Sequence, residues 1–116
     1  QVAAVRTRRQ RNPAHYDAIF DEIDALAAEG AAALAAADYE RLGELMNIDQ
    51  GLLNAIGVST PELESMVGIA RAAGAAGAKL TGGGGGGSIV ALCPGRERDV
   101  QMALETAGYK TLVITE

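Results

Sequence analysis

The sequence contains one cysteine, no tryptophan and no long apolar run. One cysteine cannot form a disulfide within the chain and is too few for a thiolate zinc site, so we expect a reducing, cytoplasmic compartment. No stretch approaches the roughly 18 apolar residues of a membrane-spanning helix. The start, Gln1–Arg6, has neither an initiator methionine nor a signal-peptide pattern. We therefore expect a soluble chain, without membrane contact, that is part of a longer protein.

The charge balance is acidic, with 10 Lys and Arg against 15 Asp and Glu and a formal net charge of −5. Such a balance gives no general attraction to nucleic acid or to anionic membranes. The local exception is a basic cluster of Arg6, Arg8, Arg9 and Arg11. It could grip an anion, but it lacks interleaved aromatic residues, and a solvated helix end is the simpler interpretation. The length predicts a single domain over residues 1–116.

The first half of the chain predicts successive helices, because apolar residues recur at intervals of three and four. The first, from Val2 to about Arg11, should stop ahead of Pro13, since the residue before a proline is pushed out of the helical region. Asn12 is the expected cap of the second helix. Gly30 is the point at which that long helix is most prone to bend or break.

Two further helices are predicted before the pattern changes at Gly74. Asp38 can cap the third, and Gly57 supplies the left-handed residue that ends it. The fourth begins at a capping-box pattern, Ser59–Glu62, with proline in its first turn. We expect Cys93 to behave as a small buried hydrophobe. The helical spacing also places all three methionines in the core: Met46, Met66 and Met102.

After Gly74, short β-branched and apolar runs are bounded by glycine and proline, which is typical of strands. The expected strands are Ala78–Thr81, Ser88–Cys93 and Thr111–Thr115, with a helix at Arg96–Ala107. The predicted fold class is therefore α+β, with helices packed on one face of a small antiparallel sheet and extra amino-terminal helices.

Six consecutive glycines join the first two predicted strands. They lose much conformational entropy on folding, so something must require them. N–H groups without neighbouring Cβ atoms can converge on one anion such as a phosphate. From spacing alone, a hairpin connection is an equally good interpretation. The candidate nucleotide- or phosphate-binding residues are Thr81, Gly82, Gly83, Gly84, Gly85, Gly86, Gly87 and Ser88, with Lys79 and Asp49 as candidate supporting residues.

Asp49 lies on the apolar stripe of the third predicted helix, between Met46 and Leu53, where a buried carboxylate would need partners. It could help to order the glycine run, with Asn47 and Gln50 nearby. The alternative is an inter-helix cap or a partly exposed side chain.

Two linked segments resemble a known kinase superfamily, named for galactokinase, homoserine kinase, mevalonate kinase and phosphomevalonate kinase. Gly77–Ser88 looks like its third signature. The upstream segments Gly43–Leu53 and Ile56–Leu63 are similar to those that mevalonate kinases carry ahead of this signature. Gly83 stands where alanine is common in the family, and Ser88 where mevalonate kinases often have cysteine. The resemblance covers essentially the whole chain.

This resemblance implies a ferredoxin-like carboxy-terminal domain of a two-domain kinase, with the glycine loop near the nucleotide phosphates. The implied reaction is ATP-dependent phosphorylation of mevalonate to 5-phosphomevalonate in isoprenoid biosynthesis. ATP and Mg²⁺ would be held mainly by an amino-terminal domain that also carries the catalytic Asp and a phosphate-binding Lys. No stretch here matches those signatures, so we expect no catalytic residue or metal ligand in this chain, which alone should be inactive.

Two alternatives stay open: another kinase of the superfamily, acting on phosphomevalonate or a sugar, and a non-catalytic binding or interaction domain. The resemblance also implies that the first, central strand of the sheet precedes Gln1. Without that strand an open edge should favour a homodimer.

Overall fold

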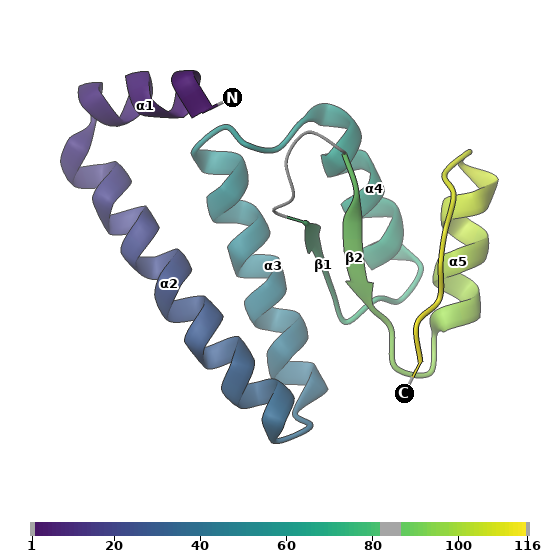
Figure 1. The fold of residues 1–116 in the computed structure, drawn as a ribbon. Coiled ribbons are helices and arrows are strands. Elements are labelled where there is room, and N and C mark those ends of the chain that lie inside the picture. The colour runs from purple at the N-terminus through teal and green to yellow at the C-terminus, as the bar shows by residue number, and fades with distance from the viewer. Residues whose placement is uncertain (1, 82–86, 116) are drawn as a thin grey trace.

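The computed structural model describes residues 2–81 and 87–115. The elements, in chain order, are α1 (Val2–Arg11), α2 (Pro13–Ala35), α3 (Tyr39–Ala55), α4 (Pro61–Ala72), β1 (Gly77–Leu80), β2 (Ile89–Leu92) and α5 (Glu97–Thr106) (Figure 1). β1 and β2 are antiparallel, with Gly77 opposite Leu92 and Leu80 opposite Ile89. Helices dominate and the sheet is small, so the predicted α+β class is confirmed.

The boundary between α1 and α2 falls at Asn12, as predicted, but Asn12 does not cap α2 with its side chain. That side chain instead donates to the carbonyl of Arg8 at 3.0 Å. Pro13, at the first position of α2, has no backbone N–H and so needs no capping acceptor. The possible break at Gly30 does not occur, because α2 runs unbroken from Pro13 to Ala35. A Cβ at Gly30 would lie 3.6 Å from the Leu42 side chain of α3.

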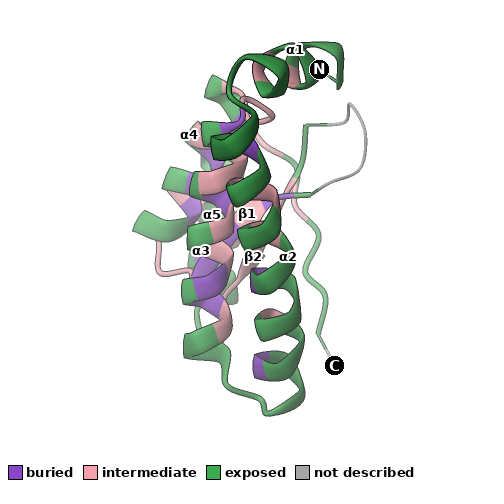
Figure 2. Ribbon diagram, turned by 90° about the vertical axis from the view of Figure 1, so that its left-hand side faces the viewer, coloured by how far each residue is buried: buried purple, intermediate pink, exposed green. Residues whose placement is uncertain are grey.

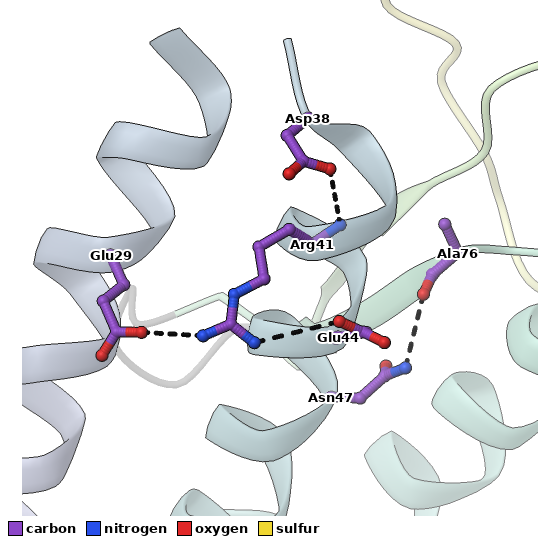
Figure 3. Close-up of polar contacts among 6 residues, drawn as sticks. All are labelled: Glu29, Asp38, Arg41, Glu44, Asn47 and Ala76. Carbon is purple, nitrogen blue, oxygen red and sulfur yellow. Dashed lines mark hydrogen bonds and ion pairs between the residues drawn. The ribbon is translucent and has the colours of Figure 1, made fainter. Parts of the chain in front are cut away.

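The ends of α3 follow the prediction. The Asp38 carboxylate accepts from the backbone N–H of Arg41 at 3.1 Å (Figure 3), and Gly57, with φ of +82°, takes the left-handed conformation just beyond the helix. The start of α4 differs in detail. Thr60 caps it by accepting from the N–H of Leu63 at 3.1 Å, so the Ser59–Glu62 box does not form.

The main core lies between the sheet, α4 and α5. Its buried residues are Leu63, Met66, Val67, Ala70, Ala78, Leu80, Val100 and Leu104. A second, smaller cluster joins α2 to α3 through Leu26, Ala33 and Leu45. Figure 2 shows buried residues on the inner sides of these elements, whereas α1 carries none. The buried residues therefore come from the sheet and from α2 to α5, and not from α1.

The three methionines do not share one environment. Met66 is in the main core, as predicted, and Met46 is half-buried. Met102 is 57% exposed, so its predicted core position is wrong. It projects away from the face of α5 that buries Val100 and Leu104, because two residues turn a helix by more than half a revolution.

Cys93 packs against the main core and is partly buried. Burial raises the pKa of the Cys93 thiol, and the nearby Glu97 carboxylate raises that pKa further. This environment fits the prediction of a small hydrophobe, because a raised pKa keeps the thiol protonated.

The predicted strand Thr111–Thr115 is wrong, since this segment is not a strand in the structure. Leu112 and Ile114 are each 84% exposed, and the segment is tied to α5 at Thr111, whose hydroxyl accepts from Gln101 at 3.0 Å. β-branched residues favour a strand only where another strand lies alongside to pair with them. In the part of the chain that the structure describes, β1 and β2 pair only with each other.

No helix within residues 2–81 and 87–115 has both the length and the apolar character needed to cross a lipid bilayer.

Candidate functional site at the stem of the glycine loop

The two strands hold the ends of the glycine run. Gly82–Gly86, five of the six predicted loop glycines, lie outside the described residues. At the mouth of the loop, the backbone N–H of Thr81 donates to the Ser88 carbonyl at 3.0 Å, and the two side-chain hydroxyls are 3.1 Å apart. Gly87 has φ of +62° and open space where a Cβ would stand. The stem thus brings two exposed hydroxyls together beside the glycines.

Side chains of α3 bind the edge of β1 that faces away from β2. Asn47 accepts from the N–H of Ala78 at 3.1 Å and donates to the carbonyl of Ala76 at 3.4 Å (Figure 3). Gln50 accepts from the N–H of Leu80 at 2.7 Å. An edge strand ordinarily leaves such groups open to another chain. Here a helix occupies the position of a neighbouring strand.

Carbonyl groups on the same edge of β1 are also satisfied by side chains. Arg71 of α4 donates to the carbonyl of Ala78 at 3.2 Å, and Lys79 donates to the carbonyl of Leu80 at 3.1 Å. Because both its donors and its acceptors are bound, β1 is fixed along its length up to the start of the loop.

The close approach of α3 to β1 depends on two glycines. A Cβ at Gly43 would overlap the carbonyl of Ala76, and a Cβ at Gly77 would lie 2.5 Å from the Gly43 carbonyl oxygen. Both obstacles are backbone atoms, which cannot swing aside as a side chain does. The two glycines therefore bring the backbones of α3 and β1 close enough for amide side chains to bridge them.

Gln50 is the most connected side chain of the site and is only 2% exposed. Besides accepting from Leu80, it donates to the Ser59 hydroxyl at 3.1 Å and to Glu64 Oε2 at 2.5 Å. Ser59 in turn donates to the same Glu64 oxygen at 2.6 Å. This network joins α3 and α4 to the last residue of β1.

Sequence reasoning named Gln50 only as a neighbour of Asp49, and it missed the roles of Ser59, Glu64 and the paired glycines at the stem. A signal was present, because Gly43, Asn47 and Gln50 recur at intervals of four and three and so share one helix face. The prediction rested instead on the apolar stripe of α3, which marks the face of that helix that meets α2.

Asp49 and Lys79 form an ion pair beside the stem. Lys79 Nζ lies 3.4 Å from Asp49 Oδ2, and the two side chains are 24% and 18% exposed. The other oxygen, Oδ1, is buried without a hydrogen-bond partner among the described residues. Both residues line a hollow of about 300 Å³ between α2 and α3. Lys79 is therefore the partner of the largely buried Asp49 carboxylate, and this carboxylate neutralises the Lys79 charge.

The basic cluster on α1 divides into two kinds of residue. Arg8 donates to the Tyr16 hydroxyl at 3.1 Å and to the carbonyl of Ile56 at 2.8 Å, which fastens α1 to the end of α3. Arg9 pairs with Asp17 at 2.8 Å. Only the exposed Arg6 and Arg11 fit the interpretation of a solvated helix end.

In the regions that the structure describes, no group of three or more His, Cys, Asp or Glu side chains could hold a metal ion. The Asp49 carboxylate, which lies beside the stem, is paired with Lys79.

The family described as "GHMP kinases C terminal" matches residues 31–110. The chain belongs to this family of kinase carboxy-terminal domains, and the predicted resemblance is confirmed.

Two curated relatives show how much of a longer protein the match covers. The mevalonate kinase of Methanothermobacter thermautotrophicus is 50% identical over 103 residues, which are 89% of this chain and 34% of that protein. The mevalonate kinase of Pyrococcus abyssi is 44% identical over 117 residues, which are 97% of this chain and 35% of that protein. The chain thus spans about a third of the length of these relatives.

A solved structure agrees with the fold. The crystal structure of L. major mevalonate kinase in complex with R-mevalonate matches with a TM-score of 0.82 and 36% sequence identity. The match covers 90% of this chain and 33% of that one.

Proposed function

We propose that this chain is the carboxy-terminal domain, residues 1–116, of a mevalonate kinase. The complete enzyme transfers the γ-phosphoryl group of ATP to the primary hydroxyl of mevalonate, giving 5-phosphomevalonate for isoprenoid biosynthesis in the cytoplasm. The observation that carries this proposal is the identity of 44% and 50% to mevalonate kinases over 97% and 89% of the chain. The structural match to a protein solved with R-mevalonate supports the same acceptor.

In this proposal the glycine loop, from Thr81 to Ser88, donates hydrogen bonds to the phosphate oxygens of ATP. Phosphoryl transfer depends mainly on positioning and on donors aimed at developing negative charge. Backbone N–H groups supply such donors without a flexible side chain. The bond between Thr81 and Ser88 supports this role because it fixes the distance between the ends of the loop. The ion pair between Lys79 and Asp49, which lies beside the stem, supports it.

The remaining chemistry belongs, in this proposal, to an amino-terminal domain that is the main partner of this chain. That domain holds Mg²⁺ and most of the ATP, and it supplies the catalytic residues. Support comes from the share of the relatives that the chain covers, about a third. The 116-residue chain alone is then inactive.

We also propose that the isolated chain forms a homodimer through β2. The outer edge of β1 is bound by α3, whereas β2 pairs with no second strand among the described residues. An unpaired strand edge attracts another strand. Sedimentation velocity over a wide range of concentrations should show a concentration-dependent dimer. A monomer at every concentration would contradict this proposal.

The proposed reaction is tested by measuring ADP release from the complete kinase with mevalonate, phosphomevalonate, homoserine and galactose at equal concentrations. Turnover with mevalonate alone is expected. Turnover with another acceptor would keep the kinase class and change the substrate, and no turnover with any of the four would favour a binding domain. In the same enzyme, Gly84→Ala and Gly85→Ala should weaken the use of ATP while the fold is kept, and unchanged kinetics would reduce the loop to a connection.

A further inference from the structure

We propose that Gln50 is a positioning residue for the nucleotide: by fixing Leu80, the last residue of β1, it holds the stem residues of the glycine loop, Thr81 and Ser88, to which the proposed function assigns phosphate binding. The inference rests on the proposed role of that loop. Gln50 does not belong to the loop and is 2% exposed, so it acts through the backbone of Leu80 and does not contact the nucleotide.

The orientation of the Gln50 amide is determined by its neighbours. Its oxygen accepts from the N–H of Leu80 at 2.7 Å, and its NH₂ group donates to Ser59 and Glu64. A carboxylate oxygen can only accept and a backbone N–H can only donate. Turning the amide over would set donor against donor and acceptor against acceptor. Gln50 therefore presents a fixed acceptor to β1.

The other end of this network is anchored in α4. Glu64 lies in the first turn of that helix, where the helix dipole favours a carboxylate, and Ser59 donates to it at 2.6 Å. α4 also packs on the sheet through the main core, which includes Leu80 itself. The position of Leu80 is thus fixed by its side chain from one direction and by its N–H from another.

Leu80 is the residue at which this constraint reaches the loop, because it stands two positions before Gly82. Thr81 follows it directly and bonds to Ser88 across the mouth of the loop. The two stem residues therefore keep their place only if Leu80 is held. Loss of the Gln50 oxygen would leave a buried N–H without a partner next to the loop, and the backbone would move to satisfy it.

Asn47 provides a matched control. It makes the same kind of bond from the same helix, accepting from Ala78 at 3.1 Å, but it does so two residues farther from the loop. Removing Asn47 takes its bonds to Ala78 and Ala76 from the edge of β1, whereas removing Gln50 takes the bond to Leu80 together with two bonds to the α4 network. Only the loss of Gln50 releases the residue from which the loop departs.

The experiment compares Gln50→Ala with Asn47→Ala in the complete kinase, with Gln50→Asn as a milder variant that keeps an amide but shortens its reach. We expect Gln50→Ala to raise the KM for ATP about tenfold while the KM for the acceptor changes less than about twofold. Asn47→Ala should also lower Tm, because it loses its bonds to Ala76 and Ala78, yet it should leave the KM for ATP within about twofold. If Gln50→Ala does not fold, Gln50→Asn should show the same selective rise.

Equal rises for the Gln50 and Asn47 variants, or no rise for either, would overturn the inference and leave Gln50 a purely structural residue. Titration with a non-hydrolysable ATP analogue separates this result from failure of the proposed function. A wild-type kinase that binds the analogue but phosphorylates no acceptor contradicts the proposed reaction, and a selective loss of affinity in Gln50→Ala would still support positioning. A wild-type kinase that does not bind the analogue overturns both.

Discussion

Replacing Gly43 with alanine should destabilise the domain by about 1–3 kcal/mol, although alanine is the better helix former. The added methyl group would overlap the carbonyl of Ala76, a backbone atom that β1 holds in place. Relief would require α3 and β1 to separate, which would lengthen the hydrogen bonds that Asn47 and Gln50 accept from the strand. Urea unfolding, followed by circular dichroism, measures the change in the free energy of unfolding.

Gly51 is the matched control because it lies in the same helix and has nothing within 4 Å of the position where a Cβ would stand. Gly51→Ala should stabilise the domain by about 0.5–1 kcal/mol through helix propensity alone. The two substitutions are chemically identical and should have opposite signs. If Gly43→Ala were also stabilising, α3 would not lie against β1 as described.

The largest loss of stability is expected for Leu104→Ala, at about 2–5 kcal/mol. Leu104 is 8% exposed and belongs to the main core, where α5 meets α4 and the sheet. Removing most of its side chain leaves a cavity that the neighbouring residues fill only in part. Thermal unfolding at constant pH would give the change in Tm and in the free energy of unfolding.

Met102 is the control for Leu104 in the same helix. Because it is 57% exposed, Met102→Ala should change the free energy of unfolding by less than about 0.5 kcal/mol. Equal losses for the two variants would mean that another surface covers Met102 in solution, and the assignment of the core to one face of α5 would then be wrong.

The sequence predicted elements better than it predicted their partners. The helix boundaries near Asn12, Asp38 and Gly57 were predicted correctly, because proline, capping residues and left-handed glycine act on their immediate neighbours. Thr111–Thr115 failed because a strand needs hydrogen bonds from elsewhere in the fold. Local preference therefore identified the residues that favour extended structure, but not whether a neighbouring strand is present.

The candidate site shows the same division. The glycine run was evident in the sequence, since six glycines in succession have few explanations. The residues that hold the stem of the loop were not evident from the sequence, because the hydrogen bond between Gln50 and Leu80 joins positions 30 residues apart. Glu64 illustrates the difficulty well. The local pattern predicted a capping box at Ser59–Glu62, whereas Ser59 donates to Glu64, which lies outside that pattern.

Gly57 combines two tasks in one residue. Its left-handed backbone turns the chain out of α3, and a Cβ at this position would overlap the guanidinium of Arg8, which donates to the neighbouring carbonyl of Ile56. Any other residue here would both strain the turn and displace the arginine that attaches α1. The end of α3 and the attachment of α1 thus depend on the same turn. The losses of stability caused by substituting Gly57 and by substituting Arg8 should therefore not add. The amino-terminal helix is attached to the domain by the same turn that ends α3.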